Sequence, residues 1–422
     1  MTMKLRNRLI ALVCLILFLG FGAAIFLTTT TRKPFAVILF LGDNISPGIL
    51  TATRLFAGGG DARLQLEDLP NAALCRNAAN DYSIPESASA STAIAAGKRV
   101  NRGSLCIDPS GAKLPSLLEL AAAQGRSTGL VTSGLITGVT AAAYYAKTLN
   151  AQDQTDLSTQ FFNHPPIDFV AGSAATLGTT NSHTSSAPGT TSLDQLTKKG
   201  VVILRSMSEL ESQPFWKKTP LLGIISPNQI PLTHPGEGDP STPSLSDLVR
   251  VAIRQLQSNR HGYFLVVDDP TIAAAAASND AESMFKRLLS FDQAVATARR
   301  YAGDKALILV AGRETIGGPQ LNGYPFLGDK GVAVLSLNAQ GSPSLCWSTG
   351  PGFALEENSD TNHAKKTKPS TPGILSQPSA YPLPQGQGVA GDVLTLGVGE
   401  GSEKLKGFLD LTDVHQLIRE KL

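Results

Sequence analysis

The sequence predicts an α/β protein in which helices cover both faces of a large, mostly parallel central sheet. Continuous apolar runs, typical of strands buried on both faces, alternate with segments whose apolar residues recur every three or four positions. Hydrophobic residues make up 42% of the 422 residues and aromatic residues only 6%, which suits a core of Ala, Val and Leu. This alternation predicts a three-layer αβα sandwich with ligands beyond the carboxyl ends of its strands.

The apolar runs give the expected elements in chain order. Two polar stretches, 178–192 and 356–388, interrupt the alternation, and their composition predicts irregular insertions. The predicted strands are 35–42, 125–133, 166–172, 262–269, 305–312 and 331–337. The predicted helices are 113–125, which ends in a glycine, 244–259, which begins with a serine cap, and 278–303.

Residues 9–27 form an uncharged run near the N-terminus. At about 1.5 Å per residue, a helix of this length just crosses a hydrocarbon core roughly 30 Å thick. We therefore predict a cytoplasmic N-terminus and a transmembrane anchor within residues 1–33, and an exported domain, periplasmic or extracellular, over 34–422. A cleaved signal peptide, which would release a secreted domain, is the alternative. Basic residues flank the run: Lys4, Arg6, Arg8, Arg32 and Lys33.

Charge and cysteine content exclude some classes of function. The net charge is +2 and no long basic stripe occurs, so a nucleic-acid partner is not expected. Cys14 lies in the uncharged run, and the spacing of the cysteines matches no zinc–cysteine site. In an oxidising compartment Cys75 and Cys106 could pair, with Cys346 left over; unpaired buried thiols are the alternative.

Polar residues at the ends of predicted elements mark a candidate site. Asp43 directly follows the first strand, and Asp268 ends the strand at 262–269. Ser87 opens a helix, where a hydroxyl can meet an anion or can cap the helix N-terminus. Acidic residues at strand ends favour a metal site.

These motifs lie in an order that resembles the alkaline phosphatase family over nearly all of residues 35–422. The resemblance implies that family's fold, two zinc ions and a magnesium ion, a serine nucleophile and a phosphate-binding arginine. One zinc ion then activates the serine and the other stabilises the leaving oxygen. The matching segments are VILFLGDNISPGILTATRLF, DYSIPESASASTAIAAGKRVNRGSLCID, TGLVTSGLITGVTAAAYYAKT, GYFLVVDDPTI, LVAGRETIGG and VAGDVLTLGVGEGSEKLKGFLDLTDVHQLI.

Carried over position by position, the resemblance retains few site residues. Asp43 matches the aspartate that bridges zinc and magnesium, Ser87 the nucleophile, and Thr140 a magnesium ligand. Asp268 stands where a magnesium-ligating glutamate is usual. The positions at which a metal ligand is lost are Ala273, Ala277 and Val389 for one zinc, Gly312 and Arg313 for the other, and Gly138 beside the magnesium; the phosphate arginine is replaced at Ala151.

Alanine, valine and glycine offer no side-chain donor, and zinc needs about three or four ligands. We therefore predict that zinc is absent and that the chain is a pseudophosphatase or a very weak phosphatase with Ser87 as a vestigial nucleophile. Asp43, Thr140 and Asp268 could still hold one magnesium ion. Arg313 could pair with Asp43 or bind a phosphate ligand.

Two alternatives stay open at this point. One is an active phosphomonoesterase with a site rebuilt around Ser87; the other is a non-catalytic envelope protein that binds an anion or a partner. Glu86 is expected to be structural. The natural ligand and the oligomeric state do not follow from the sequence. The histidines are expected to be solvated in loops or on helix flanks: His164, His183, His234, His261, His363 and His415.

Overall fold

The structure, a computed structural model, describes residues 3–30, 35–174, 192–226, 243–321, 328–335, 343–352 and 377–422. It divides into two compact units, Met1–Pro34 and Phe35–Leu422. The first contains helix α1 (Met3–Thr30). Among the described residues, no helix combines the length and the apolar character needed to cross a membrane. Most of the two predicted insertions, 178–192 and 356–388, lies outside the described residues.

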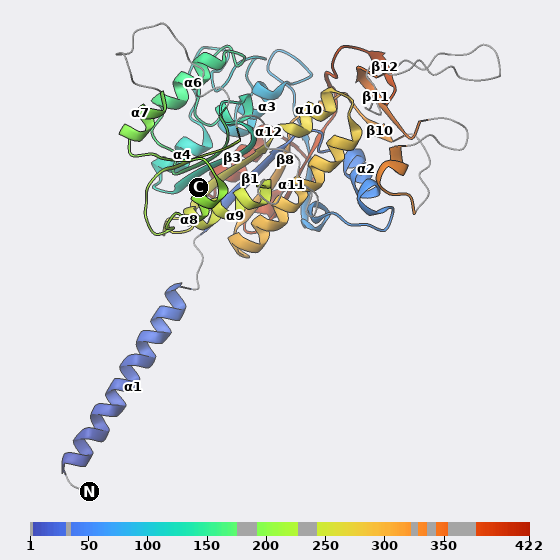
Figure 1. The fold of residues 1–422 in the computed structure, drawn as a ribbon. Coiled ribbons are helices and arrows are strands. Elements are labelled where there is room, and N and C mark those ends of the chain that lie inside the picture. Colours follow the sequence, from blue (N-terminus) through green and yellow to red (C-terminus); the bar gives the residue numbers. More distant parts are fainter. Residues whose placement is uncertain are drawn as a thin grey trace, which may run out of the picture. The chain divides into compact units, whose positions relative to one another are not determined.

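Ten strands of the described residues form the central sheet of the second unit (Figure 1). Only β14 among these ten runs antiparallel to its neighbours, so the sheet is mostly parallel, as predicted. In spatial order the strands are β15 (Phe408–Asp410), β2 (Asn71–Arg76), β14 (Val393–Val398), β8 (Leu307–Gly312), β1 (Ala36–Gly42), β7 (Tyr263–Asp269), β3 (Ser127–Leu135), β4 (Phe169–Ser173), β6 (Leu221–Ser226) and β5 (Val202–Leu204).

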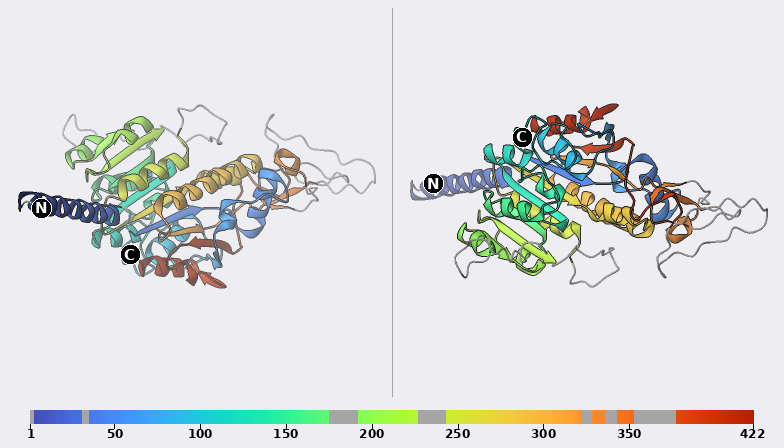
Figure 2. Two further views of the ribbon diagram at one scale, coloured as in Figure 1. Left: turned by 90° about the horizontal axis from the view of Figure 1, so that it is seen from below. Right: turned by 90° about the horizontal axis from the view of Figure 1, so that it is seen from above.

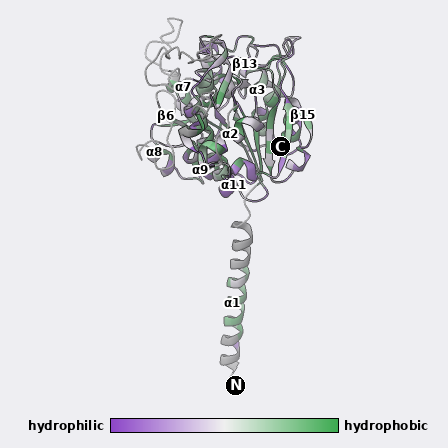
Figure 3. Cartoon of the chain, turned by 90° about the vertical axis from the view of Figure 1, so that its right-hand side faces the viewer, coloured by the Kyte–Doolittle hydropathy of each residue, from purple (hydrophilic) through white to green (hydrophobic). Residues whose placement is uncertain are grey.

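Strand β1 shows why the continuous apolar runs predict a strand covered on both faces. Successive side chains of a strand point to opposite sides of the sheet. Ile38 and Phe40 accordingly pack into one apolar core, whereas Leu39 and Leu41 pack into the other. Every residue of β1, β7 and β8 is buried. Figure 3 shows hydrophobic green on strands inside the body and hydrophilic purple on segments at its periphery.

Helices cover both faces of the sheet, which confirms the predicted α/β layering (Figures 1 and 2). The core on one face is shared by α2 (Pro47–Gly58), α8 (Met207–Ser212), α9 (Leu245–Leu256), α10 (Thr271–Ala277) and α11 (Ala281–Ala302). The core on the other face is shared by α3 (Ser87–Ala96), α4 (Leu117–Ala123), α5 (Val139–Ala142), α6 (Gln154–Asn163), α7 (Ser192–Lys198) and α12 (Leu411–Arg419).

Short elements complete the described fold. They include the 3-10 helices η1 (Gln65–Asp68) and η3 (Ser402–Lys404), the strand pair β9 (Thr315–Ile316) and β13 (Gly388–Val389), and the three-stranded sheet of β10 (Gln320–Leu321), β11 (Leu345–Gly350) and β12 (Ser379–Pro382). Strand β9 comes shortly after β8 in the chain, and Ile316 of β9 and Gly388 of β13 line the candidate site described below.

One predicted strand is wrong. The described part of 331–337 is the 3-10 helix η2 (Gly331–Leu335), which begins at a glycine with φ of 60°. Val334 and Leu335 are buried. The apolar run therefore indicates that these side chains are buried, but it does not distinguish a strand from a 3-10 helix. The helices predicted at 113–125, 244–259 and 278–303 are present as α4, α9 and α11, and Ser244 caps α9 as predicted.

The packing of α11 on β1 generates a stability prediction. Phe291 of α11 is fully buried and meets Phe40 of β1 edge to face, with ring centroids 5.6 Å apart. Phe291→Ala should lower the free energy of unfolding by about 3–5 kcal/mol, because it removes a buried ring and leaves a cavity. Phe408→Ala removes a ring that is 71% exposed and serves as the matched control. Urea denaturation of both variants checks the difference; equal losses would contradict it.

Candidate functional site

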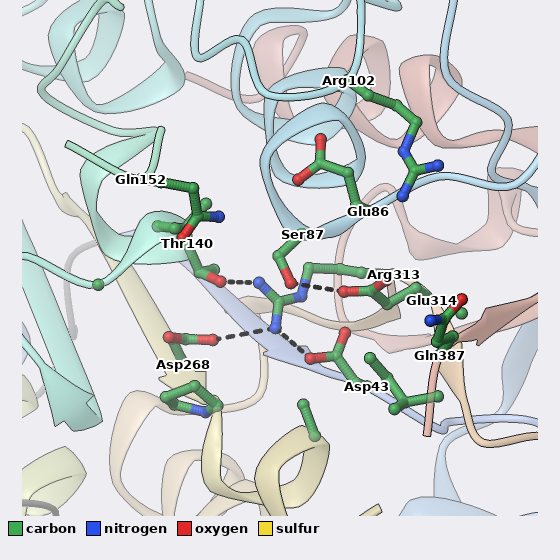
Figure 4. A pocket seen from close by; sticks show the side chains of 16 residues that line it. Asp43, Glu86, Ser87, Arg102, Thr140, Gln152, Asp268, Arg313, Glu314 and Gln387 are labelled. Atoms are coloured by element: carbon green, nitrogen blue, oxygen red, sulfur yellow. Dashed lines mark hydrogen bonds and ion pairs between the residues drawn. The ribbon is translucent and has the colours of Figure 1, made fainter. Parts of the chain in front are cut away.

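The candidate site lies where the carboxyl ends of β1, β7 and β8 meet. Register pairs Leu41 with Asp268 and Gly42 with Gly312, so the residues that follow these strands share one edge of the sheet. A pocket of about 570 Å³ opens there (Figure 4). It is lined by Asp43, Glu86, Ser87, Arg102, Gly138, Val139, Thr140, Gln152, Asp268, Pro270, Ala273, Arg313, Glu314, Ile316, Gln387 and Gly388.

A buried guanidinium occupies the floor of this pocket. Nη2 of Arg313 lies 2.6 Å from Oδ2 of Asp43 and 3.6 Å from Oδ1 of Asp268. Nη1 donates to Oγ1 of Thr140 and, at 3.1 Å, to Oγ of Ser91. The Arg313 side chain is 1% exposed. The predicted pair of Asp43 with Arg313 is therefore confirmed, and Figure 4 shows the guanidinium between Asp43, Asp268 and Thr140.

Backbone contacts fix Arg313 in this position. Its N–H donates to the carbonyl of Gly42 at 3.2 Å, which continues the pairing of β8 with β1. The side-chain amide of Asn77, which is buried, donates to the Arg313 carbonyl at 2.8 Å. The backbone N–H and the carbonyl of Arg313 are thus both hydrogen-bonded, which fixes the position of the residue that bears the guanidinium.

Asn44 orders the loop that follows β1. Its φ of 59° lies in the left-handed region, which asparagine tolerates better than most residues. Its N–H donates to the Glu314 carbonyl at 2.8 Å, while its side chain both donates to and accepts from the backbone of Ile316, at 2.8 and 3.1 Å. These bonds tie Asp43 on one strand end to Arg313 on the other.

Ser87 faces a carboxyl group that the sequence interpretation did not consider. Its Oγ donates to Oε1 of Glu314 at 2.5 Å. Ser87 is the first residue of α3, and the N-cap is Glu86, whose carboxylate accepts from the N–H groups of Ala88 and Ser89. The prediction that Ser87 caps the helix is therefore wrong, and the structural role expected for Glu86 is confirmed.

Burial dominates the ionisation of the site. It raises the pKa of Asp268 to about 7 and that of Glu314 to about 8, and it also raises the pKa of Asp43 above its ordinary value. Burial acts in the opposite direction on Arg313, but the adjacent carboxyl groups outweigh it and raise the pKa of the guanidinium. Three buried carboxyl groups therefore share one fixed positive charge.

His415 is buried, whereas the sequence predicts a solvated side chain. It belongs to α12, its Nδ1 lies 3.1 Å from the Ile94 carbonyl oxygen, and burial lowers its pKa. It is not among the residues that line the pocket, so the prediction of a solvated His415 is wrong but the site gains no catalytic group. His261 is exposed and His164 half-buried. The others lie outside the described residues: His183, His234 and His363.

Cys75 and Cys106 are not joined by a disulfide, which is the alternative that the sequence left open. Cys75 and Cys106 are free, buried thiols. Sγ of Cys75 lies 3.2 Å from Oγ1 of Thr395, and Sγ of Cys106 donates to the Ala143 carbonyl at 3.1 Å. Burial raises the pKa of Cys75 to about 11 and that of Cys106 to about 12. The pairing of these two cysteines is not present.

The residues at the expected zinc positions do not fit a zinc site. A Cβ on Gly312 would lie 2.8 Å from the Val393 Cβ and 2.9 Å from the Ile45 carbonyl oxygen, so an aspartate there would require the backbone to move. Ala273 faces the pocket with a methyl group. Among the described residues, no group of three or more His, Cys, Asp or Glu side chains is arranged to hold a metal ion.

The expected magnesium position is equally unsuitable. Oδ2 of Asp43 and Oγ1 of Thr140 already accept from the Arg313 guanidinium, and a metal cation bound beside that guanidinium would be repelled by its charge. Gly138 offers no donor, and a Cβ there would lie 2.9 Å from the Leu135 carbonyl oxygen. Asp43, Thr140 and Asp268 are thus brought together as predicted, but around a guanidinium.

Sequence comparison decides the family. A sequence model described as "Alkaline phosphatase" matches residues 35–422. The chain belongs to the alkaline phosphatase family.

Several known alkaline phosphatases resemble this family member. Alkaline phosphatase 4 of Bacillus subtilis is 28% identical over 67% of this chain and 61% of its own length. The membrane-bound alkaline phosphatase of Bombyx mori is 27% identical over 76% of this chain and 68% of its own length. A solved alkaline phosphatase variant from the Antarctic bacterium TAB5, with Mg bound, has a TM-score of 0.68 at 19% identity and covers 92% of this chain and 98% of that one.

The sequence analysis did not identify some of the residues that line the pocket of this alkaline phosphatase family member. Glu314 stands beside Arg313 in the segment LVAGRETIGG, but nothing local shows that it faces Ser87. Ala151 is buried away from the pocket lining, and the next residue, Gln152, lines the pocket instead. Val389 lies in β13 and pairs with Thr315, outside the lining.

The buried ion pair generates a second stability prediction. Arg313→Ala should lower the free energy of unfolding by about 3–5 kcal/mol, because it leaves the Asp43 and Asp268 carboxyl groups buried without a counter-charge. Arg63→Ala is the matched control: it breaks a surface pair with Asp68 in which the arginine side chain is 70% exposed, and should cost no more than about 1 kcal/mol. Chemical denaturation at pH 7 measures both. Similar small losses would show that Arg313 does not hold the site together.

Proposed function

We propose that this alkaline phosphatase family member has lost, or retains only weakly, the hydrolysis of phosphate monoesters. The observation that carries the proposal is the Arg313 guanidinium, 2.6 Å from Asp43 and within 3.6 Å of Asp268, in the space where the resemblance expects metal ions. Without metal activation, the hydroxyl of Ser87 is a poor nucleophile toward a phosphate dianion.

The absence of donors at the zinc positions supports the same proposal. Ala273, Ala277, Gly312 and Val389 carry no side-chain nitrogen, oxygen or sulfur atom, and zinc requires about three or four such ligands. The backbone atoms around Gly312 leave no space for a larger residue. We propose that zinc is not a cofactor of this chain and that the Asp43, Thr140 and Asp268 oxygens serve Arg313 in place of magnesium.

The structure gives little support to a phosphate ligand held by Arg313. Its two terminal nitrogens already donate to side chains, and the guanidinium is 1% exposed. Phosphate recognition usually requires free donors in a fork that can reach two phosphate oxygens. Arg102 is the exposed arginine of the lining. A phosphate or other anion bound here would therefore depend on Arg102.

Metal analysis combined with an activity assay tests the proposed loss of phosphatase function. The purified full chain should contain well under one zinc or magnesium ion per molecule by elemental analysis. It should hydrolyse p-nitrophenyl phosphate at least about a thousandfold more slowly than the Bacillus subtilis relative, because metal stabilisation of the transition state is missing. Added zinc should not raise the rate. Stoichiometric zinc together with turnover that Ser87→Ala abolishes would refute the proposal.

We also propose that residues 9–27 anchor the chain in a membrane and that the second unit is exported. The uncharged run and its basic flanks support this proposal, and one relative is described as membrane-bound. This support comes from the sequence, because no helix of the described residues has the length and apolar character needed to cross a membrane.

Extraction at alkaline pH tests the anchor. The full chain expressed in a bacterial host should stay in the membrane pellet, because the apolar run is buried in lipid. Replacing Ile16 and Leu19 with arginine should release the chain, since a charge in the centre of the run opposes insertion. The matched control replaces Ser110 and Ser212 with arginine. A soluble product whose mass lacks the N-terminal segment would instead establish a cleaved signal peptide.

A further inference from the structure

We propose that Ser87 and Glu314 form a metal-independent nucleophile and base that act on uncharged carboxylic esters. The inference rests on the proposed function in one respect, the replacement of metal ions by Arg313, and otherwise goes beyond it. It gives Ser87 a present chemical role that differs from phosphate-monoester hydrolysis.

The geometry of the two side chains carries the inference. Oγ of Ser87 lies 2.5 Å from Oε1 of Glu314, with the hydroxyl as donor and the carboxyl oxygen as acceptor. A nucleophile within hydrogen-bond reach of a base is the arrangement that activates a serine. Figure 4 shows the Ser87 hydroxyl pointing toward the Glu314 carboxyl, with Arg102 and Gln152 on the same lining. Ser87 is half-buried, so a ligand in the pocket can reach its hydroxyl.

Glu314 is the carboxyl group of the lining that is free for this task. The carboxylate of Glu86 accepts from the N–H groups of Ala88, Ser89 and Gly103, and Asp43 pairs with Arg313. Within the described residues, the one side-chain hydrogen bond recorded for Glu314 is the bond from Ser87.

Hydrogen bonds hold the backbone around Glu314 in place. Glu314 is 3% exposed and directly follows Arg313, whose guanidinium and carbonyl are both held by hydrogen bonds. The Glu314 carbonyl accepts from the Asn44 N–H at 2.8 Å. A base must be held at a fixed distance from the proton that it removes, and these bonds hold the backbone that carries the carboxyl group.

The charge of the lining selects the class of substrate. At a pH above 8, where burial no longer keeps the Asp268 and Glu314 carboxyl groups protonated because the pKa values are about 7 and about 8, a phosphate dianion entering the pocket would approach more carboxylates than accessible cations, since Arg313 is already paired. An uncharged ester meets no such repulsion, and the exposed side chains of Arg102 and Gln152 can donate to its carbonyl oxygen. The carboxyl groups of the lining are Asp43, Glu86, Asp268 and Glu314, and the guanidinium groups are Arg102 and Arg313.

The reaction balances without a metal ion or a redox partner. Oγ of Ser87 attacks the ester carbonyl carbon and forms the Oγ–C bond, while its proton passes to Glu314. The bond from carbon to the alcohol oxygen breaks, and the alcohol leaves with that proton. Water then attacks the acyl carbon, Glu314 accepts one proton from it, and the departing Oγ takes this proton back. One ester and one water yield one carboxylic acid and one alcohol.

Covalent labelling with a fluorophosphonate tests the pair directly. This uncharged probe reacts with an activated serine through its phosphorus atom and releases fluoride. In the full chain treated with a chelator at a pH above 8, where the pKa of about 8 leaves the Glu314 carboxyl ionised, the label should be found on Ser87 by peptide mass spectrometry, and Ser87→Ala should abolish it. Glu314→Gln should slow labelling by about a hundredfold, the usual contribution of a general base. Ser110→Ala, which alters an exposed serine, is the matched control and should label normally.

Further measurements distinguish loss of the base from loss of the fold. Glu314→Asp withdraws the carboxyl group by one methylene and should label at an intermediate rate, and thermal unfolding should show that each variant is folded. Hydrolysis of p-nitrophenyl acetate should follow the same order as labelling. Labelling at another residue, or equal rates for Glu314→Gln and the wild type, would overturn the inference. Phosphate-ester turnover with bound zinc would refute the proposed function instead, so the two failures are distinguishable.

Discussion

The buried guanidinium of Arg313 is the constraint on which the arrangement of this site depends. Three carboxyl groups lie close together in the interior, a placement that is unfavourable unless a positive charge or protons offset it. Arg313 supplies that charge as part of the chain, through its contacts with Asp43 and Asp268. In a metal-dependent site a bound cation would perform this role. Here the charge belongs to the chain itself and cannot dissociate.

The central sheet explains why one arginine can satisfy groups so distant in sequence. The carboxyl ends of β1, β7 and β8 are neighbours, and the residue after β8 points its side chain back across β1. Asn77 then fixes the carbonyl of Arg313, and Asn44 fixes the backbone that follows it. Gly312 completes the arrangement, because the backbone of Ile45 and Leu394 approaches too closely for any side chain.

Family membership and present chemistry are separate conclusions for this chain. The match over residues 35–422 establishes the family, and the fold places Ser87 at the start of α3 beside the pocket. A fold supports several chemistries, and the groups around the reacting atom decide among them. In this pocket the nearest group to the Ser87 hydroxyl is the Glu314 carboxyl, at 2.5 Å. That contact is the basis for the proposed proton transfer from Ser87 to Glu314.

The sequence by itself determined the layered fold, because burial patterns are local, and it placed Asp43 and Asp268 at one edge of the sheet, because parallel strands bring their ends together. Thr140 was matched only through the resemblance to the family. The strand predicted at 331–337 is wrong, because an apolar run indicates buried side chains but does not determine the backbone geometry. Only the tertiary structure decided that Glu86 caps α3 and that Ser87 reaches Glu314, 227 residues away in sequence. Such contacts depend on how side chains from different elements are oriented, and no local pattern encodes that orientation.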